Sequence, residues 1–162
     1  MTQQLTSSIP AVLDALDDGF TELLATRGVN GDEILVCQGE CPDPPKEYLE
    51  IGDVVGNADQ QWAHLGALTR DETYAVSITI VVQDDRHTTQ RAAKDRAFEI
   101  LGFCETWLRE NVTLGLTQTS GQFQRLEVQV ATIGTLGEPA ERGWRYVIGW
   151  AVKIDSRLRG IR

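Results

Sequence analysis

Two cysteines and an acid stand close together in the stretch CQGECPDPP, residues 37–45. Thiolates bind zinc and carry out redox chemistry, so Cys37 and Cys41 are the first residues to consider for a chemical role. A structural zinc site needs a second close pair of ligands, whereas Cys104 falls on a predicted helix and the two histidines stand apart. A redox pair favours two intervening residues and a following helix, but prolines follow Cys41. We therefore expect a rigid turn whose thiols are reduced and incidental.

Other catalytic patterns are also missing from the sequence. It contains no G-x-S-x-G, G-x-x-x-x-G-K or H-E-x-x-H motif. The paired acids Asp17–Asp18, Asp71–Glu72 and Asp84–Asp85 fall at turns or at the ends of predicted elements, where solvated carboxylates need no special explanation. Cys104 has the helical spacing of a small core residue. We expect no catalytic residue, no metal site, no cofactor and no enzyme activity.

Composition narrows the class of protein. The chain has 162 residues, 41% of them hydrophobic and 24% charged, which is typical of one folded domain spanning residues 1–162. No stretch approaches the roughly 20 apolar residues of a membrane span, and the first residues lack an export signal. The net charge of -9 opposes binding to a phosphate backbone. We expect a soluble protein, made inside the cell, that binds neither membranes nor nucleic acid.

The hydrophobic pattern predicts an α+β fold. Apolar residues recur at helical spacing from Ser8 to Gly28, and again over about 20 residues after Thr88 or Thr89. Strands are predicted at 33–37, 48–54, 73–82, 125–133 and 144–154, the last three with alternating apolar residues. Residues 56–68, 111–124 and 134–143 are expected to be loops. This order favours a mostly antiparallel sheet covered on one face by two helices, with long inter-strand loops.

Several apolar residues fall in segments that look polar or irregular. Trp62 lies within the expected loop 56–68, where an aromatic side chain either folds back onto the domain or contacts a partner. The same two alternatives apply to Leu114 and Leu116 in the segment NVTLGLTQTSG, and to Leu136 at the tip of the last hairpin. These four residues are candidates for an interface.

A pattern of elements and turns extends over most of the chain. It consists of the segments IPAVLDAL, VCQGECPDPP, EYLEIGD and ALTRDETYAVSITIVV, the helix QRAAKDRAFEILGFCETWLRE, the loop VTLGL and the strand GWRYVIGWAVKIDSRL. In this pattern the chain resembles the tail terminator proteins of long-tailed bacteriophages, particularly phages that infect actinobacteria. The resemblance lies in the order of elements and turn residues rather than in a catalytic signature. It could be shared by a neighbouring head-to-tail joining protein.

The resemblance implies an assembly protein of the virion tail, assembled in the host cytoplasm. Such proteins form a ring, generally a hexamer, that caps the tail tube, ends its polymerisation and offers the docking surface for the head. Its partners would be copies of itself, the major tail tube protein and head-tail connector proteins, and DNA would pass through without specific binding. A heterologous ring needs two complementary patches on each subunit, for which Arg70, Asp71 and Glu72 are further candidates.

Two alternatives remain open at this point. One is a head-completion or neck protein, which belongs to the same class. The other is a small-molecule-binding or hydrolytic α+β domain that uses a pocket between the sheet and the long helix. It requires a buried polar cluster that converges on a cavity, whereas the predicted sheet face carries Trp144, Tyr146, Ile148 and Trp150 with no obvious polar partner.

Overall fold

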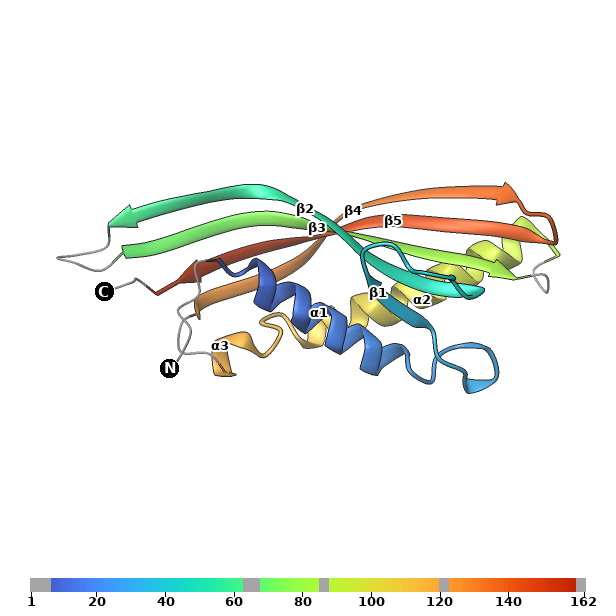
Figure 1. The fold of residues 1–162 in the computed structure, drawn as a ribbon, viewed down its shortest axis with the longest axis horizontal. Helices are drawn as coiled ribbons and strands as arrows, with labels where there is room; N and C mark the ends of the chain where they lie inside the picture. Colours follow the sequence, from blue (N-terminus) through green and yellow to red (C-terminus); the bar gives the residue numbers. More distant parts are fainter. Residues whose placement is uncertain (1–6, 63–67, 85–87, 120–122, 160–162) are drawn as a thin grey trace.

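The computed structural model describes residues 7–62, 68–84, 88–119 and 123–159 (Figure 1). A first helix precedes a short strand and two long ones; a second helix and a short third one then lead to a final long hairpin. In chain order the elements are α1 (Ile9–Leu24), a 3-10 turn (Val29–Gly31), β1 (Leu35–Gln38), β2 (Glu47–Trp62), β3 (Leu68–Asp84), α2 (Gln90–Glu110), α3 (Leu116–Thr119), β4 (Phe123–Pro139) and β5 (Trp144–Leu158).

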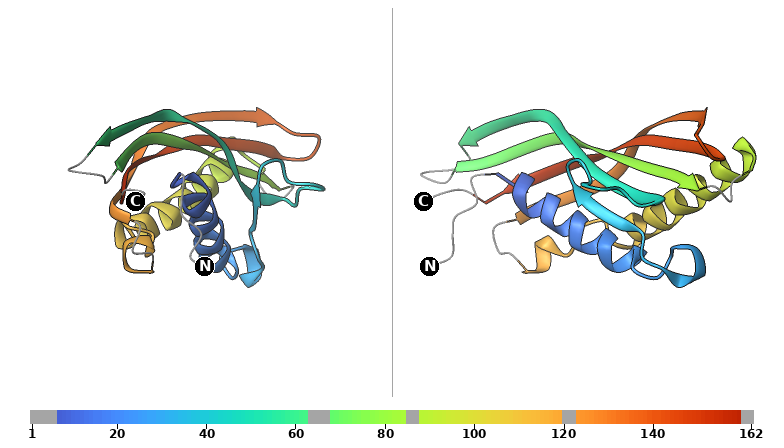
Figure 2. Two further views of the ribbon diagram at one scale, coloured as in Figure 1. Left: turned by 60° about the vertical axis from the view of Figure 1, so that its left-hand side comes forward. Right: turned by 45° about the vertical axis from the view of Figure 1, so that its right-hand side comes forward.

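The strands form one sheet in the order β1-β2-β3-β5-β4. The pairs β2–β3, β3–β5 and β4–β5 are antiparallel, and only the short β1 pairs parallel to β2. Both long helices lie on the concave side of the curved sheet (Figure 2). The predicted α+β class is confirmed, with a mostly antiparallel sheet covered on one face by two helices.

Strand β3 lies at the centre of the sheet and shows how the pattern of residues produces the layers. Its even-numbered residues from Tyr74 to Val82 are at most 3% exposed, because successive side chains of a strand point to opposite faces. They meet the apolar stripes of the helices. On α1 the stripe consists of Val12, Leu16, Phe20 and Leu24, and on α2 of Ala93, Ala97, Ile100, Leu101, Cys104 and Leu108.

The aromatic side chain of Phe20 joins the three parts of this core. Its ring centroid lies 5.3 Å from that of Trp107 on α2 and 6.2 Å from that of Trp150 on β5. Gly19 makes this approach of the two helices feasible, since a Cβ atom there would lie 2.1 Å from the Trp107 ring. Cys104 is fully buried on α2, as its helical spacing predicted.

Two of the expected loops are wrong in part, because regular strands continue through them. Strand β2 runs on to Trp62, and β3 begins at Leu68, so that most of 56–68 belongs to a long hairpin. Strand β4 continues to Pro139, paired with β5. In the extension of β4, the side chains from Gly134 to Pro139 are exposed or half-buried, so that this stretch imposes no alternation of apolar and polar residues. Within the expected loop 111–124, the four residues of α3 are helical.

The N-terminus of α2 follows its sequence signal. Thr89 accepts a hydrogen bond from the backbone N–H of Ala92 at 3.2 Å and so begins α2.

In the described ranges, no helix is both long and apolar enough to cross a membrane.

Candidate functional site

A buried polar cluster lies at the N-terminus of α1. The backbone N–H of Ser8 donates to Oε2 of Glu72 at 2.7 Å, and the Ser8 hydroxyl donates to the same oxygen. The hydroxyls of Tyr74 and Ser156 each lie 2.9 Å from Ser8 Oγ. Since the one proton of Ser8 points to Glu72, Tyr74 and Ser156 must be the donors in these two contacts. All four side chains are at most 3% exposed.

The position of this cluster explains why a carboxylate is tolerated inside the core. Ser8 is the N-cap residue of α1, but its side chain makes no capping bond to the helix. Glu72 instead places a negative charge at the positive end of the helix dipole and accepts a free N–H group. The cluster therefore anchors the first turn of α1 to strands β3 and β5.

Arg70 adds an ion pair to this anchor. Its Nε lies 2.8 Å from Oε1 of Glu72, and its side chain is 32% exposed, so it closes the cluster toward solvent. Burial is the main cause that raises the pKa of Tyr74 above its ordinary value, and it keeps the phenol protonated. A surface pocket of about 150 Å³ lies alongside, lined by Ile9, Val54, Gly56, Asn57, Arg70, Glu72 and Tyr74.

The chemistry that this arrangement supports is limited by its burial. A serine beside a carboxylate could in principle act as a nucleophile, yet Ser8 is 0% exposed and its oxygen already takes part in three hydrogen bonds. The alternative of a hydrolytic domain predicted a buried polar cluster near a cavity, and such a cluster exists. Its geometry is that of a structural anchor.

A second carboxylate–guanidinium pair anchors the other helix. Arg96 of α2 donates from Nε and Nη2 to the two carboxylate oxygens of Glu47, at 2.8 and 2.9 Å. Nη2 also donates to the backbone carbonyl of Arg27 at 2.7 Å, and Nη1 donates to Glu99 at 2.7 Å. Glu47 is 7% exposed and begins β2. The pair with Glu47 is the main cause that raises the pKa of Arg96, and the whole arrangement links α2, β2 and the segment after α1.

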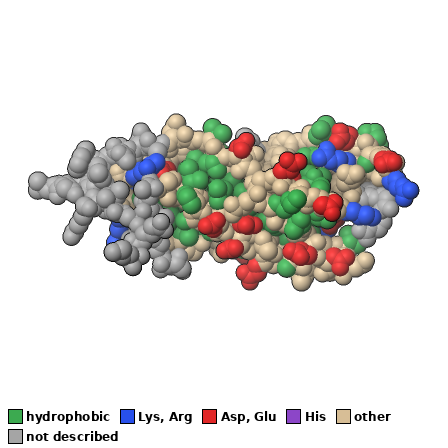
Figure 3. Space-filling view, viewed as in Figure 1, with side chains coloured by type: hydrophobic (Ala, Val, Ile, Leu, Met, Phe, Trp, Pro, Cys, Tyr) green, Lys and Arg blue, Asp and Glu red, His purple; other side chains and the backbone are tan. Residues whose placement is uncertain are grey.

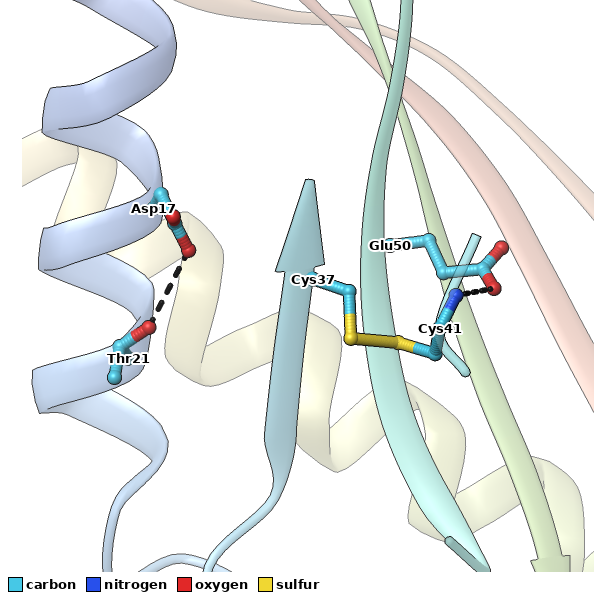
Figure 4. The surroundings of a disulfide bond; sticks show 5 residues. All are labelled: Asp17, Thr21, Cys37, Cys41 and Glu50. Carbon is cyan, nitrogen blue, oxygen red and sulfur yellow. Dashed lines mark hydrogen bonds between the residues drawn. A yellow bond between two sulfur atoms is a disulfide. The ribbon is translucent and has the colours of Figure 1, made fainter. Parts of the chain in front are cut away.

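The two cysteines of the proline-rich turn form a disulfide (Figure 4). Their Cα atoms are 5.5 Å apart, and the N–H of Cys41 donates to the Glu50 carboxylate at 3.2 Å. The expectation of reduced, incidental thiols is therefore wrong for Cys37 and Cys41. Gly39 has a φ of +80°, a conformation that lets the chain turn back sharply enough to bring the two sulfurs together.

The three charged residues at the start of β3 do not form one patch. Asp71 and Glu72 point to opposite faces of the sheet. On the outer face, Arg157 donates to both carboxylate oxygens of Asp71 at 2.6 and 2.7 Å. That pairing is the main cause that lowers the pKa of Asp71. Arg70 and Glu72 belong to the buried anchor, so Asp71 alone of the three lies outside the core cluster.

The predicted apolar contact residues occupy different settings. Leu136 is 57% exposed and pairs with Val147 in the backbone register of β4 and β5. Leu114 and Leu116 are partly buried and pack against the core. Trp62 ends β2 opposite Leu68, and its side chain lies outside the described part of the structure. His64 and His87 also lie outside it.

Two long strand edges lack a neighbouring strand among the described residues. Strand β4 is the last in the sheet and pairs only with β5. At the other side, β1 pairs with residues Tyr48–Ile51 of β2, so that no described strand lies outside β2 from Gly52 to Trp62. Val55 on this free part is 74% exposed. Unpaired edges of this length present rows of N–H and C=O groups to other chains.

Similarity to known proteins is found among solved structures. No protein-family model and no curated protein matches the chain. A chain from a structure described as "Virion of native gene transfer agent (GTA) particle" is 11% identical, with a TM-score of 0.49. The match covers 96% of this chain and 100% of that one. A likeness at this level carries no argument about function.

Sequence reasoning missed the anchors, although part of their signal was present. Glu72 and Ser156 continue the even-numbered, inward-facing series of β3 and β5, so strict alternation would have placed both in the core. The pairing of Glu47 with Arg96 joins residues 49 positions apart and leaves no local pattern.

Charge is also distributed unevenly over the surface. Acidic side chains gather over α1, where Asp14, Asp18 and Glu22 are exposed and the helix itself contains no Lys or Arg (Figure 3).

Within the described ranges, no group of three or more Cys, His, Asp or Glu residues is arranged to hold a metal ion.

Proposed function

We propose that this protein is a phage tail terminator, a structural virion protein that forms a ring on the end of the tail tube. The observation that carries the proposal is the pair of open sheet edges, which lie on opposite sides of one subunit. A ring with rotational symmetry needs two different surfaces on each subunit, because each copy contacts one neighbour on each side. The free part of β2 and the outer edge of β4 are two such surfaces.

The sequence resemblance supports the same proposal, and its segments fall on defined elements of the fold. IPAVLDAL opens α1, ALTRDETYAVSITIVV covers most of β3, QRAAKDRAFEILGFCETWLRE is α2, and GWRYVIGWAVKIDSRL contains β5. These elements form the sheet and the helical layer, on which a ring subunit would be built. In this proposal the chain is one tail-terminator domain over residues 1–162.

The partners follow from the position that we propose for the ring. One face would contact the last ring of the tail tube protein, and the opposite face would meet the head-tail connector. DNA would pass through the centre without specific binding, and a net charge of -9 favours that passage because like charges repel. Exposed Leu136 is a candidate contact for one of these two faces.

The proposal is tested by mixing the purified protein with tail tubes and examining the mixture by sedimentation and negative-stain electron microscopy. We expect ring-shaped density at one end of each tube, with six subunits per ring as the resemblance implies, counted by image classification. Tubes with bare ends, and no ring in the protein alone, would overturn the proposal. Binding to filled heads but not to tubes would instead favour a head-completion protein.

A further inference from the structure

We propose that neighbouring subunits join by antiparallel strand pairing, with residues 123–131 of β4 in one copy beside residues 52–62 of β2 in the next. This inference rests on the proposed function, because it specifies how the ring subunits contact one another. The occupant of each edge is a second copy of this chain. The rest of the sheet supplies the reasons for this choice.

The first reason is strand direction. Strands β2, β3, β5 and β4 alternate in direction across the sheet, so β2 and β4 run in opposite directions. When copies stand side by side around an axis that runs along the strands, β4 of one copy meets β2 of the next in antiparallel orientation. The sheet then continues from subunit to subunit with the pairing that predominates within it.

The second reason is that the two free segments lie at the same height on the sheet. Val55 pairs with Ala75, Ala75 with Lys153, and Lys153 with Gln129, so one row of residues runs from the β2 edge to the β4 edge. Two residues further along, another row runs through Asn57, Thr73, Asp155 and Glu127. Copies placed side by side would therefore bring the two free edges together.

The third reason is that β1 leaves only this half of the β2 edge available. Strand β1 pairs with Tyr48–Ile51, and the disulfide-closed turn follows it. The other half of β4, from Thr132 to Pro139, lies level with the part of β2 that β1 covers. Pairing is thus confined to the 123–131 half of β4.

The composition of the two edges is compatible with pairing. Neither segment 52–62 nor segment 123–131 contains Pro or Lys, the residues that commonly protect an edge. Segment 52–62 carries two acids and no basic residue, whereas segment 123–131 of β4 carries one base and one acid, Arg125 and Glu127, both exposed. Val55 is an apolar side chain 74% exposed on an edge strand, and a neighbouring strand would cover it.

Disulfide cross-linking between copies tests the pairing. Three double variants combine Val55→Cys with Arg125→Cys, Glu127→Cys or Gln129→Cys, because facing residues of paired strands are close enough for a disulfide. Each is oxidised under ring-forming conditions with tail tubes and run on a non-reducing gel. We expect at least one to give a ladder in steps of the 17.9 kDa subunit mass, while each single variant stops at the dimer.

A matched control pairs Gln129→Cys with Ser77→Cys, which is exposed on the central strand β3 away from both edges. This control and the wild-type protein, which keeps its own three cysteines, should give no ladder. Rings that are visible by microscopy while all three double variants stop at the dimer would overturn edge pairing and leave the proposed function intact. A ladder without rings or tube-end density would support edge pairing and overturn the proposed function. Absence of both would overturn the two together.

Discussion

The inner face of the sheet and the two free edges use the same strands in different ways. On the inner face, apolar stripes of α1 and α2 cover β3 and β5, and two buried carboxylates fasten the helices in place. At the edges, residues 52–62 of β2 and the whole of β4 have a strand on one side and, among the described residues, none on the other. The inner face stabilises the fold, and in our proposal the edges serve assembly of the ring. Mutations should therefore separate stability from ring formation.

The largest expected effect is at the centre of the inner face. Phe20→Ala removes a fully buried ring that contacts Trp107 and Trp150. We expect the free energy of unfolding to fall by about 3–5 kcal/mol, measured by urea denaturation. Phe98→Ala is the matched control, because that ring is 40% exposed, and its expected loss is about 1 kcal/mol. Equal losses in the two variants would contradict the assignment of Phe20 to the core.

The anchor of α2 comes next. Arg96→Met leaves the Glu47 carboxylate buried without its guanidinium, and we expect a loss of about 3 kcal/mol in the free energy of unfolding. Adding Glu47→Gln should recover part of that loss, since the uncompensated charge is then removed. Arg91→Met serves as the control because its side chain is 87% exposed. A double variant no more stable than Arg96→Met would show that the pair is not coupled.

The disulfide contributes an intermediate amount. It closes a loop with a sequence separation of 4, and its removal in Cys41→Ser should cost about 2 kcal/mol, measured by denaturation without reductant.

Thiol counting by mass spectrometry checks the same bond. The native protein should take up no alkylating reagent, because burial raises the pKa of Cys104 to about 12 and the other two sulfurs are bonded. Mild reduction should release two reactive thiols, and unfolding should expose the third. Two reactive thiols before reduction would contradict the disulfide.

The anchor of α1 is predicted to have a smaller effect. Glu72→Gln keeps the shape but removes the charge that faces the helix N-terminus and Arg70, at an expected cost of about 1–2 kcal/mol. Asp71→Asn, on the outer face, should cost less.

The loss of stability caused by Asp71→Asn should depend on pH. Arg157 holds the pKa of Asp71 below its ordinary value of 3.8, so the stabilisation is present above pH 3.8 and is lost as the pH falls below it. Wild-type and Asp71→Asn unfolding curves should therefore converge in acid. A difference that grows as the pH falls would contradict this pairing.

The smallest effect on stability is expected at the edge. Val55→Lys changes an exposed side chain, so the free energy of unfolding should shift by no more than about 0.5 kcal/mol. Ring formation should nevertheless need about five times more protein, because the cross-strand contact with the neighbouring copy is lost. Ser77→Lys, on the central strand, should leave assembly unchanged. Analytical ultracentrifugation of both variants distinguishes these outcomes.

Much of the fold could be predicted because a buried face imposes a period on the residues that form it. The alternation in β3 and β5 and the helical stripes of α1 and α2 led directly to the observed layers. Segment 56–62 shows no such period in its sequence and was therefore expected to be a loop, whereas β2 continues through it.

The candidate site was less predictable because it depends on contacts between distant parts of the chain. Ser8 and Glu72 are 64 positions apart, and neither residue type indicates burial by itself. The disulfide depends on the sharp turn at Gly39. The proline-rich composition predicted a rigid turn there, but it did not indicate that the turn brings the two cysteines together. Arg70, Asp71 and Glu72 were predicted as one charged group, whereas alternation along β3 divides them between two faces.

The central claim is that this protein ends the growth of a tail tube. Tail tube protein is polymerised in the presence and absence of the purified chain, and the tube lengths and ends are measured by electron microscopy. We predict that elongation stops after the chain is added and that a ring covers one end of each tube. Continued elongation at the same rate, with no density on the tube ends, would contradict the account.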